Sequence, residues 1–239
     1  CRNDQEVITE IPPTVKEEDK VKVYEAIWDL NMIGNGEVVN TYNTPTLINE
    51  YESTKRLRGV QGEPEKDGHL FSEWSRTGRL NHRFTFDEAP FYVSSMNDLN
   101  VVRKHQHMEL FNHQTSCQND KVRERLQIIA EYNDAAKKEL KEKGLDSQKR
   151  NYVVLNPLGQ SPTVCTMPDD FIHYSAYRPM TVREMARLQS FDDSFVFQGK
   201  RQTGGNNRQK EIPQYTLVGN AVPPLMARAI ANTVLNHIK

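Results

Sequence analysis

The sequence predicts a protein of the mixed α+β class, in which a small domain with short strands is followed by helices toward the C-terminal end. Three patterns predict it: two apolar runs separated by a proline turn between residues 152 and 166, a helix-capping signature at Thr181, and an amphipathic helix over the last residues. Hydrophobic residues make up only 36% of the 239 residues. We therefore expect folded cores joined by long polar segments.

The first half of the chain predicts few regular elements. Residues 21–30 read as a short extended entry followed by an amphipathic helix turn, whereas residues 34–68 are polar and read as loop with short strands. Asp120 is placed to cap a long helix that ends at Gly144. One apolar stripe supports this helix: Val122, Leu126, Ile129 and Tyr132.

The second half predicts a hairpin and two helices. Residues 152–155 and 163–166 read as strands, with a proline turn at 156–159 between them. A capping box predicts a helix start at Thr181, because its hydroxyl can accept from the backbone of Glu184 while the Glu184 carboxylate reaches back. The final helix is expected to be amphipathic and docked, because apolar residues recur every four positions: Met226, Ile230, Val234 and Ile238.

Composition excludes several classes of protein. No apolar run approaches the length of a membrane span. The three cysteines, Cys1, Cys117 and Cys165, are widely spaced and odd in number, so we expect reduced thiols rather than a disulfide framework or a metal site. The start, Cys1-Arg2, is not an initiator methionine, and we expect the chain to be a piece of a longer, soluble, intracellular protein.

The net charge of −1 argues against a highly basic nucleic-acid coat. One stretch, 200–210, nevertheless contains Lys200, Arg201, Arg208 and Lys210 without an acidic residue. These cations can face DNA phosphates. The alternative is a solvated loop, because residues 203–207 contain almost nothing that forms regular structure.

Two segments are more specific than any of these patterns. They are Arg178-Pro-Met-Thr-Val-Arg-Glu-Met-Ala-Arg-Leu-Gln-Ser-Phe191 and Gly219-Asn-Ala-Val-Pro-Pro224. They resemble the ninth and tenth conserved motifs of DNA (cytosine-5) methyltransferases, in the family's order and near the C-terminus. The resemblance implies a bacterial restriction-modification enzyme that methylates cytosine in DNA, located in the cytoplasm and associated with the nucleoid through DNA.

The resemblance also implies a division of the chain into three parts. Residues 1–39 correspond to the end of the catalytic domain after the family's eighth motif, residues 40–177 to a target-recognition domain, and residues 178–239 to a return to the catalytic domain. The last part would then supply C-terminal helices to a Rossmann-like methyltransferase domain.

The family's catalytic residues are not present in this sequence. None of the three cysteines follows a proline, as the nucleophile of the family does, and no glycine-rich cofactor loop follows a buried strand. The resemblance therefore implies no catalytic residue here, S-adenosylmethionine as cofactor only in the complete enzyme, and the N-terminal catalytic half as a partner.

The second partner implied by the family is double-stranded DNA. Base edges are distinguishable in the major groove, and loops of the recognition domain would read them there. The residues that the resemblance favours for DNA contact are Thr163, Thr166, Asp169, Asp170 and Arg76, with Lys200, Arg201 and Arg208 on phosphates. Other polar side chains that could take part are Arg79, Arg83, Gln114, Gln118 and Asn119, although for each alone the favoured interpretation is a solvated residue.

The two motifs themselves imply different roles. Arg183, Glu184 and Arg187 of the ninth motif are expected to organise the junction between recognition and catalytic parts. In the tenth motif, Asn220, Ala221 and Val222 are expected at the amino-acid end of S-adenosylmethionine, although the segment also reads as an ordinary helix entry.

Two other functions remain open. The chain could be a stand-alone, sequence-specific DNA-binding module without methyl transfer, or a soluble interaction domain. Addition of the missing half discriminates the first of these from an enzyme, and salt-sensitive DNA binding discriminates the second.

Overall fold

The structure is a computed structural model of the 239-residue chain. It describes residues 20–27, 30, 33–40, 110–132, 135–147, 152–168, 170–191, 195–203 and 210–238, with Ile8, Glu10, Ile11 and Pro13 before them. Most of the loop region predicted at 34–68 lies outside these residues.

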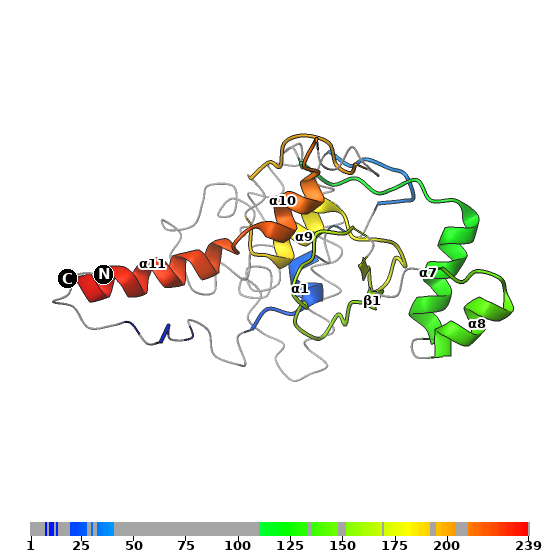
Figure 1. The fold of residues 1–239 in the computed structure, drawn as a ribbon, viewed down its shortest axis with the longest axis horizontal. Helices are drawn as coiled ribbons and strands as arrows, with labels where there is room; N and C mark the ends of the chain where they lie inside the picture. Colours follow the sequence, from blue (N-terminus) through cyan, green and yellow to red (C-terminus); the bar gives the residue numbers. More distant parts are fainter. Residues whose placement is uncertain are drawn as a thin grey trace, which may run out of the picture.

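Helices and one small sheet make up the described residues, as the mixed class predicts. The elements are α1 (Val23–Ile27), α7 (Asp120–Tyr132), α8 (Ala136–Glu142), β1 (Val153–Val154), β2 (Phe171–Ile172), α9 (Val182–Leu188), α10 (Gln214–Asn220) and α11 (Pro224–Ile238). In Figure 1, α1, α9 and α10 lie at the centre, α7 and α8 at one end, and α11 extends from the other.

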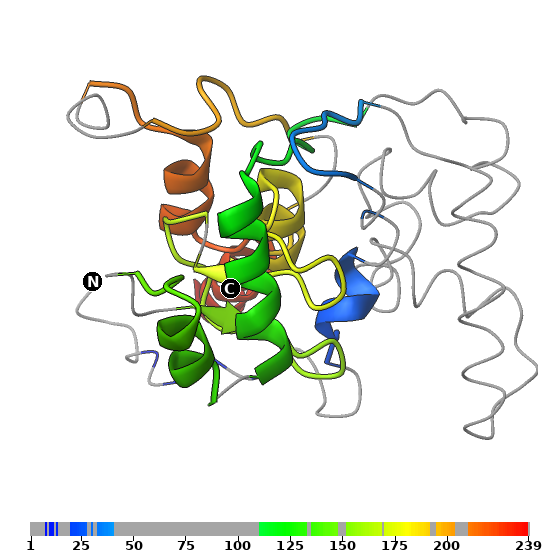
Figure 2. The same cartoon turned by 90° about the vertical axis from the view of Figure 1, so that its right-hand side faces the viewer.

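The main core forms where α9 packs against α1 and α10. Val182, Met185 and Ala186 of α9 are completely buried in it, together with Ile27 of α1 and Val218 of α10. Figure 2 shows α9 behind α7, inside the molecule. This core contains described residues from all three predicted parts of the chain, so the junction between those parts is a packed interior.

A second cluster of buried residues lies beneath α7 and α8. Leu126 and Ile129 of α7 face Leu140 of α8 there. Strand β2 joins the two clusters, because neighbouring side chains of a strand point to opposite faces. Phe171 belongs to the main core and Ile172 to the second cluster.

The predicted hairpin between 152–155 and 163–166 is wrong. The turn between them exists, with the Gly159 amide donating to the Asn156 carbonyl at 3.1 Å. Strand β1, however, pairs in parallel with β2, Val153 opposite Phe171 and Val154 opposite Ile172. Residues 163–166 are not a strand, because they leave the sheet and pack against α10 instead.

The helix predicted from Asp120 to Gly144 is two helices, α7 and α8. Its N-cap is Asn119, whose side-chain oxygen accepts from the Val122 amide at 3.0 Å, and not Asp120. Gly144 does end the second helix: it has φ of 63°, and the Gly144 and Leu145 amides donate to the Lys141 and Leu140 carbonyls. This pattern is a Schellman motif.

Residues 37–40 run antiparallel to residues 110–115. The Val39 amide donates to the His113 carbonyl, and the Thr115 amide to the Glu37 carbonyl, both at 3.0 Å. Asn40 and Leu110 are adjacent as well, because the Leu110 amide donates to the Asn40 carbonyl at 2.6 Å.

The final helix is not docked as the sequence predicts. No residue of α11 is buried, and Met226, Leu235 and Ile238 are each more than half exposed. The Leu225 amide donates to the Ser190 hydroxyl at 3.2 Å, so the helix is attached near its first turn and then projects away (Figure 1).

Within the described residues, no helix has the length and apolar character needed to cross a membrane.

Candidate functional site

Helix α9 begins with the capping box that the sequence predicts. The Glu184 amide donates to the Thr181 hydroxyl at 3.2 Å, and the Thr181 amide donates to the Glu184 carboxylate at 2.7 Å. Both residues are completely buried. The cap is therefore an interior structure of the protein.

The Glu184 carboxylate also forms a two-point ion pair with Arg178. The guanidinium nitrogens donate to the two carboxylate oxygens at 2.9 and 2.7 Å. Burial alone would raise the pKa of Glu184, but the charge and hydrogen bonds of Arg178 outweigh it and hold that pKa well below its usual range. The carboxylate is ionised and each oxygen has a donor.

Two histidines lie beside this pair. His113 Nδ1 is 2.9 Å from the Thr181 hydroxyl, and His173 Nε2 is 3.9 Å from the Glu184 carboxylate. Burial lowers the pKa of each histidine to about 4, although the Glu184 charge opposes the shift. His173 Nδ1 accepts from the Ser175 and Ala176 amides, so the neutral ring has its proton on Nε2.

Arg183 and Arg187, predicted to organise the junction, are both completely buried. Arg183 donates to the Phe111 carbonyl at 2.9 Å and to the Phe195 carbonyl at 2.7 Å. Arg187 donates to the Ala26 carbonyl at 3.4 Å. The two side chains thus join α9 to two segments that are distant in sequence, at Phe111 and Ala26, and to the segment that follows it at Phe195.

Asn112 adds a connection that the sequence did not reveal. Its side-chain amide donates to the Phe197 carbonyl and accepts from the Phe197 amide, both at 2.9 Å. This pairing fixes the segment before Lys200 against the segment that follows residue 109.

The predicted cofactor residues lie where α10 ends. Asn220 is the last residue of α10, and Ala221 has an extended backbone that leads into α11, so the Gly-Asn pair ends a helix and does not form a separate turn. Asn220 and Val222 are exposed. The Val218 carbonyl, two residues before Asn220, accepts from the Gln189 side chain, which connects α10 to the end of α9.

The predicted DNA-contacting segment passes directly over α10. Thr163 is exposed, and Thr166 and Asp170 are half-buried. A Cβ added at Gly219 would lie 2.7 Å from the Cys165 carbonyl carbon and oxygen and 2.8 Å from the Thr166 amide nitrogen. The structure therefore brings together two sets of predicted site residues, one for DNA and one for cofactor.

The predicted phosphate contacts that the structure describes are Lys200 and Arg201. Lys200 forms an exposed ion pair with Glu211 at 2.7 Å, and Arg201 donates to the Ser116 hydroxyl at 3.0 Å. Among the described residues, no hydrogen bond joins the side chain of Lys200 or Arg201 to residues 163–166. Arg76, Asp169 and Arg208 lie outside the described residues.

Sequence reasoning missed three contributors to this site: Arg178, Asn112 and Gly219. Arg178 and Gly219 stand inside the two quoted motifs, so their positions were visible but their contacts were not. Within the described part of the chain, no group of His, Cys, Asp and Glu can hold a metal ion.

Comparison with known proteins gives the family. The model of the C-5 cytosine-specific DNA methylase family matches residues 2–236. The chain belongs to this family.

Its relatives are named as type II methyltransferases. M.DdeI of Desulfomicrobium norvegicum is 46% identical over 79 residues, 33% of this chain and 19% of the relative. M1.HphI of Haemophilus parahaemolyticus is 50% identical over 76 residues, 31% of this chain and 18% of the relative. M.AquIB of Picosynechococcus is 42% identical over 89 residues, 36% of this chain but 64% of the relative. The match thus spans about a fifth of the first two relatives.

Proposed function

We propose that this chain supplies target recognition and completes the cofactor site of a DNA (cytosine-5) methyltransferase, an enzyme that transfers a methyl group from S-adenosylmethionine to cytosine. Residues 40–177 face the DNA, and residues 178–239 return to the catalytic domain. Such an enzyme acts with DNA in the bacterial cytoplasm, and its relatives' names as type II methyltransferases support a restriction-modification role.

The observation that carries this proposal is the contact at Gly219. The backbone of the helix that ends at Asn220 touches the backbone at Cys165 and Thr166 without an intervening side chain. Methyl transfer to a base requires the base and the methyl donor to be adjacent. A DNA-contacting segment resting on the end of the cofactor-contacting helix provides that adjacency.

The buried network of α9 makes the arrangement rigid. Arg183 and Arg187 tie α9 to α1, to residues 111–112 and to residue 195 through hydrogen bonds, and Glu184 holds Arg178 and the Thr181 cap. Rigid support matters because a small displacement between reacting groups costs much of the rate. We assign these three residues a positioning role and no contact with substrate.

Recognition and attachment are assigned to different residues. Thr163, Thr166, Asp169 and Asp170 contact bases or the adjoining backbone, and Arg76, Lys200, Arg201 and Arg208 contact phosphates. Base contacts set sequence preference, whereas phosphate contacts only position the protein. The exposure of Thr163 and Lys200 fits such contacts.

The chain acts with an N-terminal half that contributes the Pro-Cys nucleophile and most of the S-adenosylmethionine site. The exposed apolar residues Met226, Val234 and Ile238, which recur on one face of α11, are the surface that this half covers. A relative of which 64% is matched by 89 residues of this chain shows that a protein can consist largely of such a segment.

The test is methyl incorporation. The purified chain alone should transfer no labelled methyl group from S-adenosylmethionine to DNA, and addition of the N-terminal half of a family member should restore transfer. Activity of the chain alone would refute the assignment of the nucleophile to the partner. Sequence-specific DNA binding that never yields methylation with any N-terminal half would favour a stand-alone DNA-binding module instead.

A further inference from the structure

Residues 195–201 form a segment that side chains from other parts of the chain hold in place. Three backbone carbonyls of this segment, at alternate positions, each accept a hydrogen bond from a side chain: Phe195 from Arg183 at 2.7 Å, Phe197 from Asn112 at 2.9 Å, and Gly199 from Gln214 at 2.8 Å. Arg183 belongs to α9 and Gln214 to α10, whereas Asn112 precedes α7. The backbone that leads to Lys200 is therefore held at three points.

Asn112 holds Phe197 through two hydrogen bonds. Its side chain donates to the Phe197 carbonyl and also accepts from the Phe197 amide, both at 2.9 Å. The backbone of Asn112 itself has φ of 64°, a conformation that asparagine adopts more readily than most residues. Asparagine therefore meets both requirements of this position, the left-handed backbone and the two-point pairing.

Gln214 holds the two residues that follow. Its side chain donates to the Gly199 carbonyl at 2.8 Å, and its backbone amide donates to the Lys200 carbonyl at 2.9 Å. Gly199 has φ of 86°, a conformation in which glycine is not strained. With Asn112 on residue 197 and Gln214 on residues 199 and 200, the backbone of Lys200 has a fixed position.

The Lys200 side chain is the part of this segment that can meet DNA. It is 67% exposed, and its ion-pair partner Glu211 is exposed as well, so a phosphate can approach the ammonium group without displacing buried structure. Binding a phosphate orders the lysine side chain at a cost in conformational entropy. A backbone that is already held adds little to that cost.

We propose that Asn112 and Gln214 are positioning residues that act through Lys200, because they hold its backbone where the ammonium group contacts a DNA phosphate. This inference rests on the proposed function, in which Lys200 contacts a phosphate. It goes further, because Asn112 stands in the part proposed for recognition and Gln214 on the helix that ends at the proposed cofactor residue Asn220. The phosphate contact then depends on both parts of the chain.

The experiment measures how the affinity of the full chain for one duplex falls with salt concentration. Each phosphate contact contributes about one unit to the slope of log K against log salt. Lys200→Gln should reduce this slope by about one unit, and so should Asn112→Gly, in which glycine keeps the backbone conformation and loses only the side chain. The double variant should lose about one unit in total and not two, because both changes remove the same contact.

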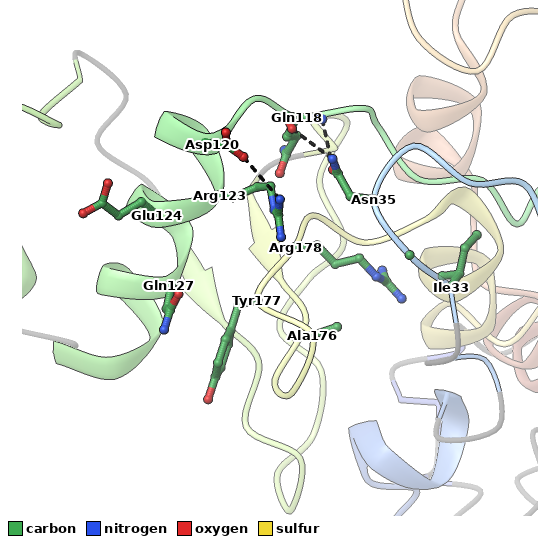
Figure 3. Close-up of a pocket in the computed structure, with 11 residues that line it drawn as sticks. Ile33, Asn35, Gln118, Asp120, Arg123, Glu124, Gln127, Ala176, Tyr177 and Arg178 are labelled. Carbon is green, nitrogen blue, oxygen red and sulfur yellow. Dashed lines mark hydrogen bonds and ion pairs between the residues drawn. The ribbon is translucent and has the colours of Figure 1, made fainter.

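Asn35→Gly is the matched control. The Asn35 side chain pairs with the Gln118 backbone in the same two-point way, donating to the carbonyl at 2.9 Å and accepting from the amide at 3.0 Å (Figure 3). This pairing does not involve residues 195–201, so Lys200→Gln should still remove about one unit of slope from the Asn35→Gly chain. A general loss of stability, measured by thermal melting, would affect both asparagine variants.

Gln214→Ala is the second variant, and it keeps the inference testable if Asn112→Gly does not fold. It should also reduce the contribution of Lys200 to well below about one unit of slope. An undiminished contribution of Lys200 in the Asn112→Gly chain, or in the Gln214→Ala chain, would overturn the inference alone. An unchanged slope for Lys200→Gln by itself, or a chain that binds no duplex, would overturn the proposed phosphate contact as well.

Discussion

Glu184 is the single side chain with the greatest predicted effect on stability. It is fully buried and accepts from Arg178 and from the Thr181 amide. Glu184→Gln keeps the shape but leaves the Arg178 charge unpaired in the interior, which should cost about 3–5 kcal/mol of unfolding free energy. Glu211→Gln, which removes the exposed partner of Lys200, should cost less than about 1 kcal/mol. Equal losses in urea denaturation would mean that the buried pair does not hold the core.

His113 and His173 make stability depend on pH. Their pKa values are about 4 in the folded protein against 6.5 for an unperturbed histidine. Between these values the unfolded chain binds more protons than the folded one, so unfolding free energy should be fully present above pH 6.5 and fall as the pH drops toward 4. Chemical denaturation at pH 7, 6, 5 and 4.5 measures this slope. His113→Gln should reduce it, and an unchanged slope would show that His113 already titrates normally.

Gly219 should not tolerate any side chain. A Cβ there would lie 2.7 Å from the backbone of Cys165, and overpacking of this kind costs about 1–3 kcal/mol. Gly219→Ala should therefore destabilise the chain although alanine favours helices, and it should also impair DNA binding if the 163–166 segment is displaced. Gly159→Ala is the control, because the three atoms nearest to its Cβ would all belong to the Asn156 side chain, the first at 3.1 Å, and not to the backbone. A thermal midpoint for Gly219→Ala at or above that of the control would contradict the close contact.

At the scale of elements, local signals predicted local structure. The structure confirms the capping box at Thr181 and the turn at 156–159. Both were predictable because each depends on residues no more than three positions apart. The parallel pairing of β1 with β2 could not be predicted, since it joins residues 18 positions apart. Apolar character at 163–166 suggested a strand, but Val164 is buried in the main core instead.

The ends of helices were predictable to within one residue where the cap is local. Asn119 and Asp120 are both good N-cap residues, and only the hydrogen bond to Val122 distinguishes them. No proline or glycine stands between α7 and α8, so neither residue type predicts the break between the two helices. For the candidate site, the two motifs supplied the residues that we propose, whereas the contact of Gly219 with Cys165 depends on the tertiary fold.

The Schellman motif at Gly144 gives a test at this scale. Gly144 has φ of 63° and no atom within 4 Å of an added Cβ, so substitution affects backbone conformation alone. Gly144→Ala should lower the unfolding free energy by about 1–2 kcal/mol. Gly144→Asn should cost less, because asparagine adopts the left-handed conformation more readily. If both variants have the melting temperature of the wild-type chain, the end of α8 does not contribute to the cooperatively unfolding structure.

In the whole molecule, the core and the final helix differ in the burial of their apolar residues. Residues from α1, α9, α10 and β2 share one core, whereas α11 leaves that core with Met226, Val234 and Ile238 of its apolar face exposed. The expectation of a docked helix came from its periodicity, which identifies an apolar face but not its partner. An exposed apolar face of this kind is what a missing catalytic half would cover.

We propose that this chain decides which DNA sequence a cytosine-5 methyltransferase modifies. The test combines the chain with the N-terminal halves of two family members that methylate different sequences, and maps the cytosines that receive a labelled methyl group. We expect both combinations to methylate one and the same sequence, set by this chain, and neither half to be active alone. Methylation that follows the N-terminal half in each combination would contradict it.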